Sequence, residues 1–194
     1  MALLHCARPA SAWKGLGVCL EEAVHTYVIQ VTGGRETHAR DLITRLMGEL
    51  VGECFIPRRE VFRRVDREWT SVTETLFPGY VFVRTNQIQQ VSERLGSVPA
   101  FTRLLGKSDE KIIPLSSEEV AWLEALLAPV SKVLEKSVGV IEGDRVIVTE
   151  GPLKGHEAQI SKIDRHKRAA YLDMHMFGRH KTIKVGLEIV RKSS

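Results

Sequence analysis

The last third of the chain sets the strongest limit on what it can fold into. From residue 138 onward, β-branched and aromatic residues occur in short runs, which glycines and charged residues separate at intervals of about 8–12 residues. The runs are residues 140–141, 146–148, 160–163, 171–177, 183–185 and 189–190. This spacing predicts a small all-β barrel, a fold that needs only about 55 residues.

The preceding part mixes strands with helices. A β-branched run at 27–31 ends in a turn at 32–34, and apolar residues between 39 and 50 then repeat with helical spacing until Gly52. Strand pieces at 61–62 and 70–72 predict a hairpin with a polar tip at 63–69, and the strongest strand is 80–83. A short helix over 88–95, a strand over 99–105 and a helix that starts at Ser116 and ends near Pro129 complete this part.

The order of these elements predicts an α+β chain with two domains. We expect an antiparallel sheet with flanking helices over residues 25–128, a linker at 129–138 and the barrel at 139–194. Charged residues and prolines break the apolar patches of residues 1–24, which predicts a poorly ordered extension; a targeting segment is the alternative.

Composition excludes several classes of protein. The chain is 43% hydrophobic and 27% charged, as in globular proteins, and no apolar stretch approaches the roughly 20 residues that cross a bilayer. Three scattered cysteines predict neither disulfides nor a zinc site, so we expect the protein in the reducing cytoplasm. We also expect a monomer. No phosphate loop or nucleophile motif is present, and His175 and His180 lack further ligands, so we expect no enzyme activity, cofactor or metal.

The positive charge is concentrated at the C-terminal end. Residues 1–136 carry 17 basic and 17 acidic side chains, which leaves 11 basic and 7 acidic ones, and therefore the whole net charge of +4, for residues 137–194. Seven of these basic residues lie within 162–184, and most of the seven fall in two predicted turns, at 164–168 and 178–181. Such clusters bind phosphate groups and release counterions, although a solvated basic surface is the alternative.

Four segments resemble one known family. Residues 143–158 (GDRVIVTEGPLKGHEA) resemble a KOW motif, and residues 176–179 (MFGR) resemble the matching loop of the bacterial elongation factor NusG. Residues 76–83 (LFPGYVFV) and 113–116 (IPLS) are similar to the NusG N-terminal (NGN) domain. Because the segments agree in order and spacing, the resemblance to the NusG family extends over roughly residues 25–192.

A finer likeness is to the specialised NusG paralogues called LoaP, which are antiterminators. Residues 151–155 (GPLKG), the basic turn 164–168 (DRHKR) and the ending 186–190 (GLEIV) look more like that subfamily than like housekeeping NusG. LoaP proteins are recruited by an RNA hairpin in a leader transcript, so the resemblance implies that the basic barrel binds RNA.

The resemblance also implies a docking site for RNA polymerase. In this family the NGN domain binds the clamp helices of the polymerase and disfavours pausing and termination. The segment that matches the docking surface contains Phe77, Pro78, Gly79, Tyr80 and Phe82. Aromatic side chains suit an interface, but a buried core strand is the alternative for the same pattern. Strand alternation assigns Val81 and Val83 to the core.

The candidate RNA-binding residues are the basic side chains of the barrel. Phe177 is separate, because the matching residue of housekeeping NusG contacts either the termination factor Rho or a small-subunit ribosomal protein; packing on Met174 or Met176 is the alternative. Housekeeping NusG and a ribosome-associated KOW protein remain the alternative functions. The RNA-binding candidates are Lys154, Lys162, Arg165, His166, Lys167, Arg168, Arg179, His180, Lys181 and Lys184.

Overall fold

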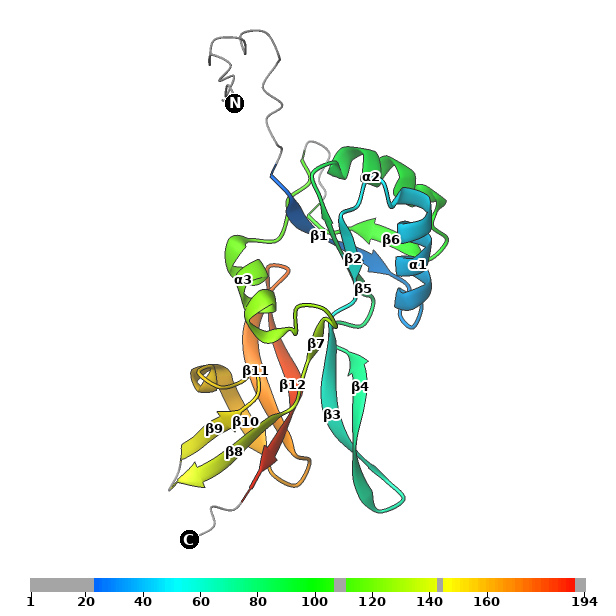
Figure 1. Ribbon diagram of the computed structural model, residues 1–194. Helices are drawn as coiled ribbons and strands as arrows, with labels where there is room; N and C mark the ends of the chain where they lie inside the picture. The colour runs from blue at the N-terminus through cyan, green and yellow to red at the C-terminus, as the bar shows by residue number, and fades with distance from the viewer. Residues whose placement is uncertain (1–22, 107–110, 143–144, 191–194) are drawn as a thin grey trace, which may run out of the picture.

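The computed structural model of the chain describes residues 23–106, 111–142 and 145–190 (Figure 1). Residues 1–22 of the expected extension and residues 143–144 of the KOW-like segment lie outside these ranges. Within them, no helix is long and apolar enough to cross a membrane. The first part contains β1 (His25–Val31), α1 (Glu36–Met47), β2 (Glu53–Phe55), β3 (Arg58–Val65), β4 (Glu68–Thr75), β5 (Tyr80–Thr85), α2 (Ile88–Arg94), η1 (Leu95–Ser97), β6 (Phe101–Leu104) and α3 (Ser117–Leu126). It is followed by β7 (Val133–Leu134), β8 (Ser137–Glu142), β9 (Arg145–Glu150), η2 (Glu157–Gln159), β10 (Ile160–Asp164), β11 (Ala169–Met176) and β12 (Arg179–Ile189).

The N-terminal sheet has four strands in the order β2-β5-β1-β6, with antiparallel pairing throughout. Helices α1 and α2 cover one face of it (Figure 1). The predicted helical stripe is confirmed in part: Ala39, Ile43 and Met47 are fully buried there, whereas Leu46, expected in the same stripe, is 43% exposed. The helix ends at Met47 rather than at Gly52, because the amides of Leu50 and Val51 both bond to the Met47 carbonyl and turn the chain.

The hairpin of β3 and β4 is longer than the sequence predicts. Each strand has eight residues, and the polar residues assigned to its tip continue the ladder, with Arg64 opposite Trp69. The turn consists of Asp66 and Arg67, which have φ values of 49° and 70°. Two positive-φ residues match the twist of a tight hairpin, but the usual asparagine-glycine signal is missing, so the sequence did not reveal the turn.

The C-terminal part is a curled five-stranded sheet in the order β10-β11-β12-β8-β9, the small all-β KOW barrel that the sequence predicts (Figure 1). The run at 183–185 and the first residue of the run at 189–190, expected in separate strands, belong to one 11-residue strand, β12, which ends at Ile189. Gly186 lies within it where β12 passes β3: a Cβ on Gly186 would lie 2.9 Å from the Glu60 carbonyl oxygen. The glycine therefore allows a close crossing and does not mark a turn.

The two parts pack on each other through one shared apolar core. The segment expected as a linker contains β7, which pairs in parallel with β3, so the chain passes to the C-terminal sheet along the base of the hairpin. Helix α3 lies between the sheets (Figure 1), and its buried residues Leu123 and Leu126 belong to the same cluster as residues from both. That cluster includes Val28, Phe77 and Phe82 from the first part and Leu153, Met174, Met176 and Ile183 from the second.

Candidate functional site

The turn before β5 is fixed by a buried carboxylate. Gly79 has a φ of 83°, which favours glycine, and its carbonyl oxygen accepts a 2.9 Å bond from the Val31 amide. Glu36, only 7% exposed at the start of α1, accepts bonds from the amides of Gly79 (2.6 Å) and Gly34 (3.1 Å). Burial raises the pKa of Glu36, but bonds from the backbone amides of Glu36 itself, Gly79 and Gly34 outweigh it and hold the pKa below its usual 4.5.

Strand β5 has two apolar faces. Val81 and Val83 are fully buried against the helices, which confirms their predicted place in the core. On the other face lies an aromatic cluster of Phe77, Tyr80 and Phe82. Phe77 and Phe82 are 2% and 0% exposed, and Tyr80 is half-buried. The three aromatic docking candidates therefore lie together and are largely covered, whereas Pro78 is exposed and Gly79 is half-buried in the turn before the strand.

The cover is Phe177, at the turn between β11 and β12. Its ring centroid lies 4.9 Å from that of Tyr80, 5.5 Å from Phe77 and 5.9 Å from Phe82. Phe177 has a φ of 59°, a conformation that costs a bulky residue about 1–3 kcal/mol. Aromatic pairs contribute about 0.5–1.5 kcal/mol each, so contacts with three rings offset this strain. Of the two interpretations of Phe177, packing within the chain describes this arrangement: its ring contacts Phe77, Tyr80 and Phe82, and it packs against the apolar cluster that also includes Met174 and Met176.

Two polar side chains of α3 bind the C-terminal part, one at the Phe177 turn and one at η2. The Glu119 carboxylate accepts a 2.7 Å bond from the Phe177 amide while it also caps the helix with Ser116. One turn further along, the Trp122 indole donates to Gln159 at 3.0 Å. The sequence identified the cap, but not that the same carboxylate reaches the barrel, because that contact joins residues 58 positions apart.

Lys181 belongs to this contact as well. Its ammonium lies 5.0 Å from the Tyr80 ring centroid, 5.1 Å from that of Phe177 and 6.0 Å from that of Phe77. Burial, together with the charge of Arg179, lowers the pKa of Lys181. A lysine predicted to bind RNA is therefore engaged between the two sheets.

Arg168 is engaged in a second contact between the parts. Its guanidinium pairs with Glu188 at 2.7 Å and lies 5.5 Å from the Phe62 centroid and 5.7 Å from the Trp69 centroid of the β3–β4 hairpin. In the same turn, one carboxylate oxygen of Asp164 accepts a bond from the Lys167 amide, and this bond lowers the pKa of Asp164. The other carboxylate oxygen lies 3.6 Å from the Lys167 ammonium.

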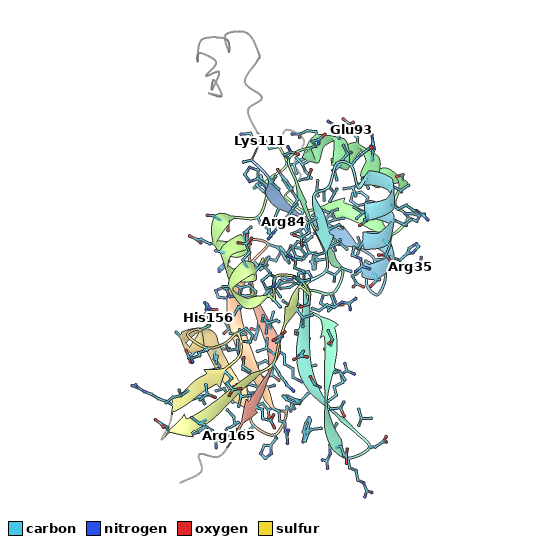
Figure 2. All side chains as sticks on the ribbon, viewed as in Figure 1. Arg35, Arg84, Glu93, Lys111, His156 and Arg165 are labelled. Atoms are coloured by element: carbon cyan, nitrogen blue, oxygen red, sulfur yellow. The ribbon has the colours of Figure 1, made fainter. Side chains whose placement is uncertain are left out.

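The remaining RNA-binding candidates are divided between surfaces. Arg165, in the same turn as Arg168, lies at the end of the C-terminal sheet that is far from α1 (Figure 2). Lys154 lies in the turn after β9. His180 stacks edge-on against His175, with ring centroids 4.4 Å apart, and no further ligand among the described residues completes a metal site there. The exposed candidates are Lys154, Lys162, Arg165, His166, Lys167, Arg179 and His180, and Lys184 is half-buried.

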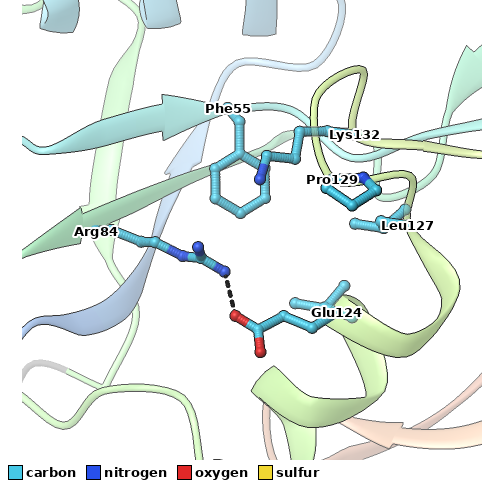
Figure 3. Close-up of a pocket in the computed structure, with 7 residues that line it drawn as sticks. Phe55, Arg84, Glu124, Leu127, Pro129 and Lys132 are labelled. Carbon is cyan, nitrogen blue, oxygen red and sulfur yellow. Dashed lines mark hydrogen bonds and ion pairs between the residues drawn. The ribbon is translucent and has the colours of Figure 1, made fainter.

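A cavity of 240 Å³ lies beside α3 (Figure 3). Arg84 and Lys132 flank the ring of Phe55 at 5.6 and 5.1 Å from its centroid. Both cations are already paired, Arg84 with Glu124 at 2.7 Å and with Glu53 at 3.2 Å, and Lys132 with Glu53 at 2.8 Å. Both cations that line the cavity are therefore neutralised by carboxylates, and the Arg84–Glu124 pair joins α3 to the N-terminal sheet.

Comparison with known proteins points to one family for both parts. A family model described as "Transcription termination factor nusG" matches residues 25–124, and a KOW motif model matches residues 142–172. "Transcription termination/antitermination protein NusG" of Helicobacter pylori is 26% identical over 169 residues, which cover 82% of this chain and 93% of that protein. The protein of the same name from Lactococcus lactis is 30% identical over 161 residues, which cover 79% of this chain and 84% of that protein.

A solved structure agrees with this at the level of the fold. NusG of Thermotoga maritima, in a structure described for its domain interaction, aligns with a TM-score of 0.51 and 24% identity. The alignment covers 84% of this chain and 94% of that one.

Proposed function

Because the chain belongs to the NusG family of transcription termination/antitermination proteins, we propose that it is a processive antiterminator of the LoaP type. Residues 25–128 bind the clamp helices of RNA polymerase through Phe77, Pro78, Gly79, Tyr80 and Phe82. Residues 139–194 bind an RNA hairpin in the nascent transcript.

One observation carries the polymerase-binding part of this proposal. The aromatic face of β5 is covered by a turn from the other sheet, whereas the opposite face is covered by the helices of its own domain. Buried aromatic side chains dominate the energy of protein interfaces. An aromatic face with a separable cover is suited to exchange one apolar partner for another.

The covered arrangement adds a condition to this function. Polymerase and the Phe177 turn compete for Phe77, Tyr80 and Phe82, so the turn must leave before the polymerase docks. The same opening frees Phe177 for a second protein partner, Rho or a small-subunit ribosomal protein, as in the alternative of a housekeeping NusG. The exposed basic residues of the barrel favour the RNA-binding subtype.

Co-purification of core RNA polymerase with the full chain tests the docking assignment. Tyr80→Ala removes a half-buried ring from the aromatic cluster, and we expect polymerase recovery to fall at least about tenfold, since interface hot spots contribute about 2 kcal/mol or more. Leu46→Ala, on the exposed side of α1 and 43% exposed, is the matched control and is expected to bind normally. Recovery of ribosomal subunits without polymerase would refute the proposal in favour of a ribosome-associated protein.

A further inference from the structure

One half-buried aromatic residue of the barrel, Tyr171, lies between two lysines on neighbouring strands. In the register of the C-terminal sheet, Lys162 of β10 is opposite Tyr171 of β11, and Tyr171 is opposite Lys184 of β12. Directly opposed residues place their side chains on the same face of a sheet. The ammonium of Lys162 lies 5.8 Å from the Tyr171 ring centroid.

This row lies on the outer face of the sheet. Along β11, Ala170, Leu172 and Met174 are buried, whereas the alternating residues Tyr171 and Asp173 are half-buried and exposed. Lys162 is exposed and Lys184 is half-buried. None of the three belongs to the cover over the aromatic face of β5, so the row remains accessible while the two parts of the chain are packed together.

The other basic candidates do not offer the same combination. Lys181 is held among the rings of Phe77, Tyr80 and Phe177, and Arg168 lies over Phe62 of the hairpin. An aromatic ring between two cations provides both elements by which proteins hold unpaired nucleotides: a surface on which a base stacks and charges that bind the adjoining phosphates.

We infer that Tyr171 is a base-stacking residue, and that an unpaired base of an RNA hairpin loop lies on its ring while Lys162 and Lys184 bind the flanking phosphates. The exposed turn residues Arg165 and His166 extend the site, since the turn joins the two strands that carry Lys162 and Tyr171. At the other end, the site stops at Asp173, because its carboxylate, which accepts a 2.6 Å bond from the Thr182 hydroxyl, repels phosphate. This inference rests on the proposed RNA-binding function and assigns it a position at which RNA binds without opening the chain.

The test measures binding of the full chain to RNA hairpins with a randomised loop, at several salt concentrations. Tyr171→Leu keeps an apolar side chain on the strand but removes the ring, and we expect it to weaken binding about 5- to 150-fold with an unchanged salt dependence. Tyr171→Phe keeps the stacking surface and should bind like the wild type. Lys162→Ala and Lys184→Ala should each reduce the log–log salt slope by about 0.7.

Arg45→Ala, which removes an exposed cation of α1 in the other part of the chain, and a blunt RNA duplex without a loop are the matched controls. The variant is expected to bind RNA as the wild type does, and the duplex is expected to bind more weakly than the hairpins. Equal affinity of Tyr171→Leu and the wild type for the hairpins, or equal binding of the duplex, would refute the stacking site while the RNA-binding function stands. If the wild-type chain binds none of the hairpins, the RNA-binding function itself is wrong.

Discussion

Replacement of Phe177 by alanine should open the chain, and the structure gives the size of the effect. The ring contacts three aromatic rings at centroid distances of 4.9–5.9 Å and the ammonium of Lys181 at 5.1 Å. At about 0.5–1.5 kcal/mol per aromatic pair and about 0.5–2 kcal/mol for the cation–π contact, the substitution removes about 2–6 kcal/mol from the packed arrangement. The ratio of open to packed molecules therefore rises about 30-fold or more, since about 1.4 kcal/mol corresponds to a factor of ten.

Two measurements on the full chain check this result. Small-angle X-ray scattering should give a larger radius of gyration for Phe177→Ala than for the wild type, and co-purification should recover more RNA polymerase. Phe177→Tyr, which keeps the ring, is the control and should remain compact. Circular dichroism verifies that both variants are folded. If Phe177→Ala is folded yet matches the wild type in size and in polymerase recovery, the assigned competition between Phe177 and polymerase is wrong.

Two further substitutions test the Glu36 carboxylate that fixes the turn before β5 and the close crossing of β12 and β3 at Gly186. Because backbone bonds lower the pKa of Glu36, its carboxylate contributes stability above the ordinary pKa of 4.5, and this contribution is lost as the pH falls through the lower folded value. Glu36→Gln should therefore flatten the acid side of a plot of unfolding free energy against pH; an unchanged acid limb would contradict the assignment. Gly186→Ala places a methyl group 2.9 Å from the Glu60 carbonyl oxygen and should lower the free energy of unfolding, measured in urea, by about 1–3 kcal/mol. Gly155→Ala is the control: no atom lies within 4 Å of the added Cβ, but φ is 84°, so this variant measures the cost of backbone strain without a close contact. A Gly186→Ala variant as stable as the wild type would show that β12 does not pass β3 so closely.

Much of the local structure could be read from the sequence because its causes are local. The helix of residues 36–47 follows from apolar side chains at helical spacing, and the start of α3 follows from the Ser116 and Glu119 cap. The tight turn of β3–β4 could not be read in the same way. Its two positive-φ residues, Asp66 and Arg67, are stable through the eight cross-strand pairs that they connect, and these pairs are contacts of the folded hairpin.

The candidate site was predictable in its parts but not in its arrangement. The alternation along β5 separated Val81 and Val83 from the aromatic face, because strand geometry alone decides which residues share a face. That Glu119 bonds to the Phe177 amide, that Lys181 lies over Tyr80 and that Tyr171 lies between two lysines all depend on how distant segments meet. Such contacts carry no signal in a single sequence.

The sequence by itself determined the two kinds of domain, the family to which they belong and the concentration of positive charge in the second. Periodicity, caps and motifs express short-range sterics and hydrogen bonding, which adjacent residues specify. Only the tertiary structure decided which of these residues are available. It covered the aromatic face of β5 with Phe177 and placed Lys181 and Arg168 between the two parts of the chain, but left the row of Lys162, Tyr171 and Lys184 accessible. The physical reason is that burial is a property of packed surfaces, so a residue's neighbours in space, and not those in the chain, determine what it can bind.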